Sequence, residues 1–183
     1  MNGKHIGLHE NGVMAVGFDL TPFLNFGGEN VIALRTDNDW RYKERSTGSL
    51  FQWNDRNFNA NYGGVPKWLH ITDKLYQTLP LYSNLQTTGT YIYASDIKVR
   101  TREAVVHAES QVRNEYGKSV HVDYEVSIYD YDGKRVSTFR GQPTTVQSGE
   151  TVVLKASAPL KDLHFWSWGY GYLYDVKTTL LVN

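Results

Sequence analysis

Residues 120–133 read VHVDYEVSIYDYDG and carry the clearest structural signal in the chain. Apolar and polar side chains alternate along the stretch, which is the pattern of a β-strand with one buried and one solvent-facing side. The Asp132-Gly133 pair then predicts a hairpin turn, with a return strand over residues 135–139. The two faces of the strand are predicted to hold Val122, Tyr124, Val126 and Ile128 on the buried side and His121, Asp123, Glu125 and Ser127 on the other.

The segments on both sides continue this pattern. Strands are predicted at residues 97–101, 104–113, 151–156 and 172–182, separated by turn signals such as Ser148-Gly149-Glu150. In residues 104–113, one face carries Val106, Ala108, Ser110 and Val112, and the other carries Val105, His107, Glu109 and Gln111. Short alternating strands at intervals of about ten residues are typical of an immunoglobulin-like sandwich. The Cys-Trp-Cys signature of antibody domains is absent, because the chain has no cysteine.

The first half of the chain is less regular. Asn2-Gly3 predicts a type I′ hairpin turn that only Met1 precedes, so we expect the chain to start inside a domain. Residues 19–24 predict one helical turn, with Thr21 as N-cap and Pro22 at the first helical position. Strands are expected at 4–9, 13–18, 67–72 and, most clearly, 30–37; residues 74–95 are interpreted as a connector, with a domain boundary near Ser95.

A long segment from Phe51 to Trp68 has neither helical nor strand periodicity and predicts an ordered loop. It contains two tryptophans, four asparagines and several other polar side chains. Flat aromatic faces beside amide and carboxylate groups suit a sugar ring. The alternative is that the aromatics close the end of a sandwich while the asparagines form turns. The candidate sugar-binding side chains are Trp53, Asp55, Asn57, Phe58, Asn59 and Asn61.

Composition excludes several function classes. The 183 residues contain 19 basic and 19 acidic side chains without a basic run, which disfavours a nucleic-acid partner. No apolar run is long enough to cross a bilayer, so no membrane partner is predicted, and the first residues lack the apolar segment of a secretory signal. The absence of cysteine excludes disulfides, thiolate metal sites and cysteine nucleophiles.

Several segments resemble one protein family in the family's own order. Residues 2–9 (NGKHIGLH), 18–24 (FDLTPFL) and 28–38 (GENVIALRTDN) resemble the later part of the jelly-roll sugar-binding domain of glycoside hydrolase family 2. Residues 61–65 (NYGGV) and 68–71 (WLHI) resemble the loop and strand that close that domain. Residues 163–167 (LHFWS) and 172–174 (YLY) resemble the end of the immunoglobulin-like domain that follows it. The loop at 51–64 looks most like β-galactosidase-type members.

This resemblance implies an all-β chain of two domains: an incomplete jelly roll over residues 1–95 and an immunoglobulin-like sandwich over 96–183. Family members continue into a (β/α)₈ barrel that supplies both catalytic carboxylates. Retaining hydrolysis needs these carboxyl groups about 5 to 5.5 Å apart, and no pair in this sequence resembles that arrangement. The resemblance therefore implies a non-catalytic fragment of a retaining exo-glycosidase, inactive by itself, with no catalytic residue, metal or cofactor assigned.

The family's sugar-contacting residue does not match exactly in the 51–64 loop of this sequence. Counting back from Gly64, the place of a sugar-contacting Asp in some members is occupied here by Phe58. The nearby polar side chains are therefore alternative sugar contacts, with Trp53 or Phe58 as a stacking surface. For each of them a role in turn formation or packing competes with sugar contact.

Three other groups suggest sites but have simpler explanations. His5 and His9 are four residues apart, which in the expected strand separates them by about 13 Å and disfavours a shared metal. Asp130 and Asp132 suggest calcium, but the turn at Gly133 explains them. The aromatic side chains Trp166, Trp168, Tyr170, Tyr172 and Tyr174 could form a sugar platform, but are predicted to fill the end of the core and a contact to a neighbouring domain.

The main alternative is a free-standing carbohydrate-binding or assembly module that works without a barrel. The expected partners are a weakly bound carbohydrate, the barrel of the parent enzyme and a second copy of the chain. Self-association is expected because an open jelly roll exposes strand edges. The chain itself gives no localisation; the resemblance is compatible with a periplasmic or secreted parent.

Overall fold

The computed structural model describes residues 1–10, 14–37 and 69–182, and their contacts divide into two compact units. The first unit comprises Met1–Leu8 and Phe18–Ile71, and the second comprises His9–Gly17 and Thr72–Asn183. Apart from one short 3₁₀ turn, the regular structure of the described residues is all β. None of the helices that these residues form is long and apolar enough to cross a membrane.

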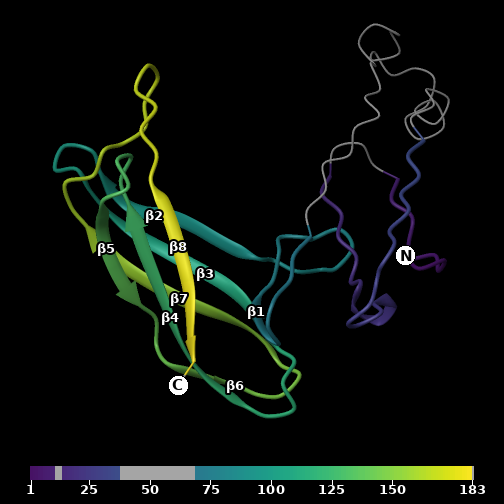
Figure 1. Ribbon diagram of the computed structural model, residues 1–183. Coiled ribbons are helices and arrows are strands. Elements are labelled where there is room, and N and C mark those ends of the chain that lie inside the picture. Colours follow the sequence, from purple (N-terminus) through teal and green to yellow (C-terminus); the bar gives the residue numbers. More distant parts are fainter. Residues whose placement is uncertain (11–13, 38–68, 183) are drawn as a thin grey trace, which may run out of the picture. The chain divides into compact units, whose positions relative to one another are not determined.

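The second unit contains two four-stranded antiparallel sheets (Figure 1). Its strands are β1 (Leu75–Gln77), β2 (Thr90–Lys98), β3 (Glu103–Asn114), β4 (Val120–Tyr129), β5 (Arg135–Arg140), β6 (Thr144–Val146), β7 (Thr151–Leu160) and β8 (Asp175–Val182). In one sheet β3 is the central strand. Both β1 and β2 pair with the same edge of β3, β1 near its end and β2 along the rest, and β7 pairs with the opposite edge. In the second sheet β4 is central, with β5 and β6 on one side and β8 on the other.

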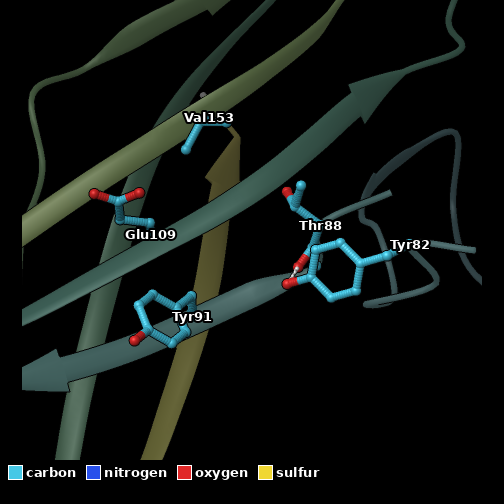
Figure 2. Close-up of a pocket in the computed structure, with 6 residues that line it drawn as sticks. Tyr82, Thr88, Tyr91, Glu109 and Val153 are labelled. Atoms are coloured by element: carbon cyan, nitrogen blue, oxygen red, sulfur yellow. Dashed lines mark hydrogen bonds between the residues drawn. The ribbon is translucent and has the colours of Figure 1, made fainter. Parts of the chain in front are cut away.

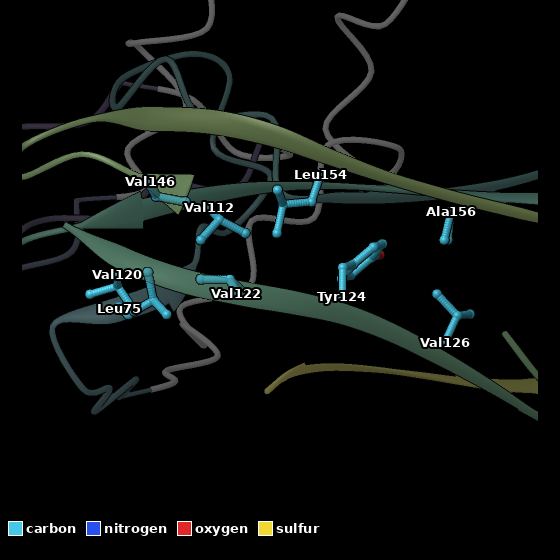
Figure 3. Close-up of a cluster of buried hydrophobic side chains, with 10 residues drawn as sticks. Leu75, Val112, Val120, Val122, Tyr124, Val126, Val146, Leu154 and Ala156 are labelled. Atoms are coloured by element: carbon cyan, nitrogen blue, oxygen red, sulfur yellow. The ribbon is translucent and has the colours of Figure 1, made fainter. Parts of the chain in front are cut away.

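The core lies between the two central strands (Figure 3). The predicted inner face of β4 is confirmed, because Val122, Tyr124, Val126 and Ile128 are all at most 2% exposed. Ala108 and Val112 of β3 oppose them, together with Leu154 and Ala156 of β7. Removing this apolar surface from water supplies the main favourable free energy of the sandwich.

Asn114, the last residue of β3, is a fully buried polar side chain at one end of the sandwich. Its Nδ2 donates to the carbonyl oxygens of Lys118 at 2.9 Å and Val146 at 3.0 Å. Its Oδ1 accepts the backbone N–H of Tyr116 at 2.9 Å. One amide group therefore satisfies backbone groups of the β3–β4 turn and of β6, which would otherwise be unpaired on burial.

The main chain of Asn114 extends this link to a third segment. Its N–H donates to the carbonyl oxygen of Glu150 at 3.0 Å, and its carbonyl oxygen accepts the N–H of Gly149 at 2.9 Å. Gly149 has a φ of 74°, a left-handed conformation that glycine adopts without steric cost. Asn114 thus joins the β3–β4 and β6–β7 turns to each other.

A second group of polar side chains crosses the core from one sheet to the other. Gln77 of β1 accepts through Oε1 from Thr90 of β2 at 3.1 Å and from Thr178 of β8 at 2.7 Å. Ser110 of β3 shares hydrogen bonds with Thr90 at 2.7 Å and with the Tyr124 hydroxyl at 2.8 Å. Burial raises the pKa of Tyr124, and its hydrogen bonds to Ser110 and Thr178 partly offset that rise.

The predicted hairpin after β4 is confirmed by the pairing of β4 with β5. Gly133 has a φ of 76°, whereas Asp132 is not among the residues with positive φ. The N–H of Gly133 donates to the carbonyl oxygen of Asp130 at 2.9 Å, so the turn spans four residues and ends in a left-handed glycine. The Asp130 carboxylate accepts the N–H groups of Asp132 and Lys134, which gives it a structural role in this turn.

In the first unit, the turn at Asn2-Gly3 is confirmed. Both residues have positive φ, 50° and 75°, and the N–H of Lys4 donates to the carbonyl oxygen of Met1 at 2.9 Å. The Asn2 side chain donates to Asn30 Oδ1 at 2.9 Å and accepts the N–H of Val31 at 2.9 Å. These bonds hold the turn against the segment that begins at Asn30.

The helical turn is also present, as the 3₁₀ helix η1 (Thr21–Phe23), with one correction. Leu20, and not Thr21, is the N-cap, and it makes no side-chain capping bond. Instead, the N–H of Thr21 donates to the Asp19 carboxylate at 2.9 Å. Asp19, two positions before the expected cap Thr21, therefore supplies the side-chain acceptor at the start of the helical turn.

The strands expected before β1 are not formed by the described residues. No strand is assigned within residues 4–9, 14–18, 30–37 or 69–72. A strand needs a neighbour to receive its backbone hydrogen bonds, and the bonds recorded for Val31 go to the Asn2 turn. The alternation of side chains within 30–37 therefore predicted an extended segment, but it could not predict whether another strand would pair with that segment.

The interpretation of residues 74–95 as a connector is wrong. Residues 75–77 form β1 and residues 90–95 belong to β2, and both pair with β3. The boundary predicted near Ser95 consequently lies inside β2, whereas the second compact unit already includes Thr72. Short edge strands with many turn-forming residues between them give a weak sequence pattern, which explains the misreading.

Replacing Asn114 with alanine should lower the free energy of unfolding by about 3 kcal/mol, because buried backbone groups lose their partners. Urea denaturation would measure the change, and Gln147→Ala, at an exposed position in the β6–β7 turn, is the control with an expected change within about 0.5 kcal/mol. Equal stability of Asn114→Ala and the unmodified chain would contradict this role.

The raised pKa of Tyr124 predicts a loss of stability at alkaline pH. Above pH 10.0, the ordinary tyrosine value, the unfolded chain releases this proton while the folded chain retains it, so stability falls as pH rises toward the folded pKa. Tyr124→Phe should make the decline above pH 10.0 shallower, because the raised pKa of this hydroxyl is then absent. Chemical denaturation at each pH measures the slope, with the exposed Tyr131→Phe as control.

Candidate functional site

The sugar-binding residues predicted in the 51–64 loop lie outside the described residues. This applies to Trp53, Asp55, Asn57, Phe58, Asn59 and Asn61. Their role in sugar contact therefore stays a prediction. The candidate functional features that the structure describes belong to the second unit.

The connection between β7 and β8, residues 161–174, extends beyond the ends of the strands and forms a small aromatic hairpin (Figure 1). At its tip Ser167 and Tyr170 exchange backbone hydrogen bonds of 3.0 and 2.8 Å. Gly169 has a φ of 81°, which suits the third position of a tight turn. The turn places Trp168 at the outermost point, with 95% of its surface exposed.

The base of the hairpin is anchored in the sandwich. Leu163 is 6% exposed and packs with Ala104, Ile128 and Leu160. Its N–H donates to the carbonyl oxygen of Arg102 at 2.9 Å. The hairpin is therefore joined to the β2–β3 turn as well as to its own strands.

Stacked rings stiffen the arms of the hairpin. His164 stacks on Tyr172 with ring centroids 4.5 Å apart, and Tyr170 lies on Tyr172 at 5.9 Å. The Tyr174 hydroxyl accepts the N–H of His164 at 2.8 Å, and the Tyr170 hydroxyl bonds His164 Nδ1 at 3.0 Å. Burial raises the pKa of Tyr174 above its ordinary value.

The prediction that Trp166 and Trp168 fill the end of the core is wrong for this sandwich. Trp166 is 63% exposed and Trp168 is 95% exposed, whereas the apolar base is formed by Leu163 with Phe165 and Tyr174 packed beside it. Two large apolar side chains on a rigid, projecting hairpin present surface that another protein surface can bury. The part of the prediction that concerns a neighbouring domain is not tested.

A second aromatic group lies on the outer face of the first sheet and was missed by the sequence analysis. Tyr91 stacks on Tyr93 at 5.2 Å, and Tyr93 stacks on His107 at 4.7 Å. The signal was the alternation of Tyr91 and Tyr93 around Ile92, which the connector interpretation of residues 74–95 obscured.

Several carboxylates of the second unit form structural pairs. Glu125 of β4 accepts two hydrogen bonds from its cross-strand partner Arg140, at 2.9 and 2.7 Å. Asp73 accepts the Tyr116 hydroxyl at 2.7 Å, and this bond lowers the pKa of the carboxyl. Within the described ranges, no group of three or more His, Asp or Glu side chains is placed to hold a metal ion.

Comparison with known proteins gives a consistent result. The family model described as "Glycosyl hydrolases family 2" matches residues 90–183. A β-glucuronidase of Formosa agariphila is 33% identical over 98% of this chain, and the β-galactosidase BoGH2A of Bacteroides ovatus is 25% identical over 100% of it. The chain spans 18% and 19% of those two proteins.

Solved structures agree at the level of the fold. The structure of a β-glucuronidase from glycoside hydrolase family 2 aligns with a TM-score of 0.56 and 29% identity, covering 60% of this chain and 11% of that one.

The anchor and the tip of the aromatic hairpin should differ sharply in their effect on stability. Leu163→Ala should cost about 2–4 kcal/mol of unfolding free energy, because it opens a cavity beside Ala104 and Leu160. Trp168→Ala should change it by less than about 0.5 kcal/mol, because the ring is exposed. Urea denaturation of the two variants measures the contrast. A large loss from Trp168→Ala would show that the indole packs within this chain.

Proposed function

The chain belongs to glycoside hydrolase family 2, and we propose that it is a non-catalytic accessory part of a glycosidase of this family. The second unit acts as an immunoglobulin-like spacer, and the first unit belongs to a jelly-roll sugar-binding domain. The parent enzyme removes terminal glycosyl residues from its substrate, and its catalytic carboxylates lie outside this chain.

The observation that carries the proposal is the match between the family model and the sandwich. The model covers residues 90–183, which includes every strand from β2 to β8. The best-buried polar side chains of this region, Ser110 and Asn114, hold sheets and turns together. Such a body is suited to fixing the position of other domains, because its internal hydrogen bonds resist deformation.

The aromatic hairpin supports a specific way in which the sandwich could fix the position of the catalytic barrel. Trp166 and Trp168 are exposed at the tip, while Leu163 fixes the base in the core. Burying two indoles against another part of the parent would contribute several kcal/mol, so the hairpin is the proposed contact to the catalytic barrel. A second copy of the chain and a carbohydrate bound by the 51–64 loop remain the other proposed partners.

Two sugars are candidates for the parent's substrate. The resemblance of the 51–64 loop supports a β-galactosidase, and the β-galactosidase relative matches over the full chain. The relative with the higher identity, 33% against 25%, is a β-glucuronidase, which favours a terminal glucuronide as the second candidate.

The isolated chain should hydrolyse neither chromogenic β-galactosides nor chromogenic β-glucuronides, because retaining hydrolysis needs a carboxyl pair that the proposal places elsewhere. Release of nitrophenol above background measures this, with the Formosa agariphila β-glucuronidase as positive control. Turnover by the purified chain, abolished by heat, would contradict the accessory role.

A chimera tests the docking role of the hairpin. The matching segment of the Formosa agariphila enzyme is replaced by this chain, and Trp168→Ala is then made in the chimera and in the isolated chain. The variant should destabilise only the chimera, by about 2 kcal/mol, because the indole is buried only there. Val136→Ala, which removes an exposed apolar side chain of β5 instead of the hairpin, is the control. No destabilisation of the folded chimera by Trp168→Ala would contradict docking through the hairpin.

A further inference from the structure

The outer face of the first sheet contains a small depression that none of the roles above uses. Its volume is about 260 Å³, and it lies where the 78–89 loop meets β2 (Figure 2). The lining residues are Tyr82, Thr88, Gly89, Tyr91, Glu109 and Val153. Figure 2 shows Tyr91 on β2, Tyr82 next to Thr88, and Glu109 and Val153 on the neighbouring strands. We call this depression the tyrosine slot.

The Tyr91 side of the slot is supported by a stack of rings. Tyr91 is 60% exposed, yet it packs on Tyr93 at 5.2 Å, and Tyr93 packs on His107 at 4.7 Å. His107 Nε2 is in turn hydrogen-bonded to the Ser95 hydroxyl at 2.8 Å. The Tyr91 ring is thus exposed but held in place, so little conformational entropy is lost when a ligand packs on it.

The Tyr82 side is held by the loop. The Tyr82 hydroxyl donates to the carbonyl oxygen of Thr88 at 3.1 Å, and the Thr88 N–H donates to Gln111 Oε1 at 3.0 Å. Gly89 has a φ of 67°, and a side chain there would place its Cβ 2.6 Å from the Pro80 nitrogen. The loop is therefore closed by a glycine that no other residue can replace without strain.

The floor of the slot supplies hydrogen-bonding groups. Glu109 is cross-strand partner to Tyr91 on one side and to Lys155 on the other, so all three side chains share the outer face. Lys155 Nζ donates to Glu109 Oε1 at 2.9 Å, and this bond raises the pKa of the lysine. The lysine bond uses Oε1 of Glu109, so Oε2 of the same carboxylate can accept a hydrogen bond from a ligand hydroxyl.

From this geometry we infer that the tyrosine slot binds one neutral pyranose ring of a saccharide. The apolar face of the sugar packs on the Tyr91 ring beside Tyr82, and a hydroxyl donates to Glu109. The volume is below the range of about 300 to 1,000 Å³ found for most small-molecule sites, so the depression itself accommodates one ring and not a longer saccharide. The carboxylate in the lining disfavours a uronic acid or a phosphate, because like charges repel.

This inference does not rest on the accessory role proposed above. The lining residues of the slot belong to the second unit and include none of the candidate side chains at 51–64, so the slot is proposed as an additional sugar site. In a protein that acts on saccharide chains, a second weak site raises the local substrate concentration by holding another ring of the same chain.

The test is a titration of the ¹⁵N-labelled chain with methyl β-galactoside, methyl β-glucoside and methyl β-glucuronide, followed by amide chemical shifts. The neutral glycosides should bind with millimolar affinity and shift the amides of Tyr82, Thr88, Gly89 and Tyr91. Tyr91→Ala should weaken binding at least about fivefold, because the stacking contact is lost. Glu109→Gln should weaken the neutral glycosides and strengthen the glucuronide, because it removes the repulsive charge and releases Lys155.

Tyr131→Ala is the matched control, since Tyr131 is an exposed tyrosine of the other sheet's hairpin and should leave binding unchanged. The absence of shifts at about 100 mM glycoside, far above a millimolar Kd, would overturn the inference. So would unchanged binding by Tyr91→Ala, or shifts confined to residues 51–64, which would place sugar binding in the loop. Failure of these titrations would leave the hydrolysis and chimera experiments unaffected.

Discussion

The second unit depends on one buried amide. Asn114 lies where β3 ends, fully removed from water, and its side chain pairs backbone groups from Tyr116, Lys118 and Val146. Because unpaired backbone groups are costly in a core, this side chain fixes how two turns close the sandwich. Apolar packing between β3 and β4 supplies most of the driving force, but it does not by itself specify where those strands stop.

The surface features for which functions are proposed rest on this frame. The aromatic hairpin begins at Leu163 in the core, so the exposed indole of Trp168 is presented from a fixed base. The tyrosine slot uses the outer faces of β2, β3 and β7, whose inner faces are packed in the core. Such an arrangement would suit the proposed accessory role, because rigid elements position contacts more accurately than free loops do.

Sequence patterns predicted what depends on local alternation and turn chemistry. The faces of β4, the hairpin at Gly133 and the turn at Asn2-Gly3 follow from neighbouring residues, and all three are present. Patterns failed where partners are distant in the sequence. Alternation in residues 30–37 could not reveal which strand would pair with them, and an asparagine at position 114 looks like a surface residue until the turns around it are known. The exposed Trp168 was misassigned because large aromatics are usually buried.

Hydrogen exchange of individual amides tests the central claim most directly. Turn amides usually exchange quickly by local opening, whereas core amides exchange only when the whole domain opens. If Asn114 holds the turns as described, the amides of Tyr116 and Gly149, which donate to it, should exchange as slowly as those of Val122 and Val126 in β4. Exchange of the two turn amides a thousandfold or so faster than the strand amides would show that the Asn114 bonds open independently, and would contradict the account.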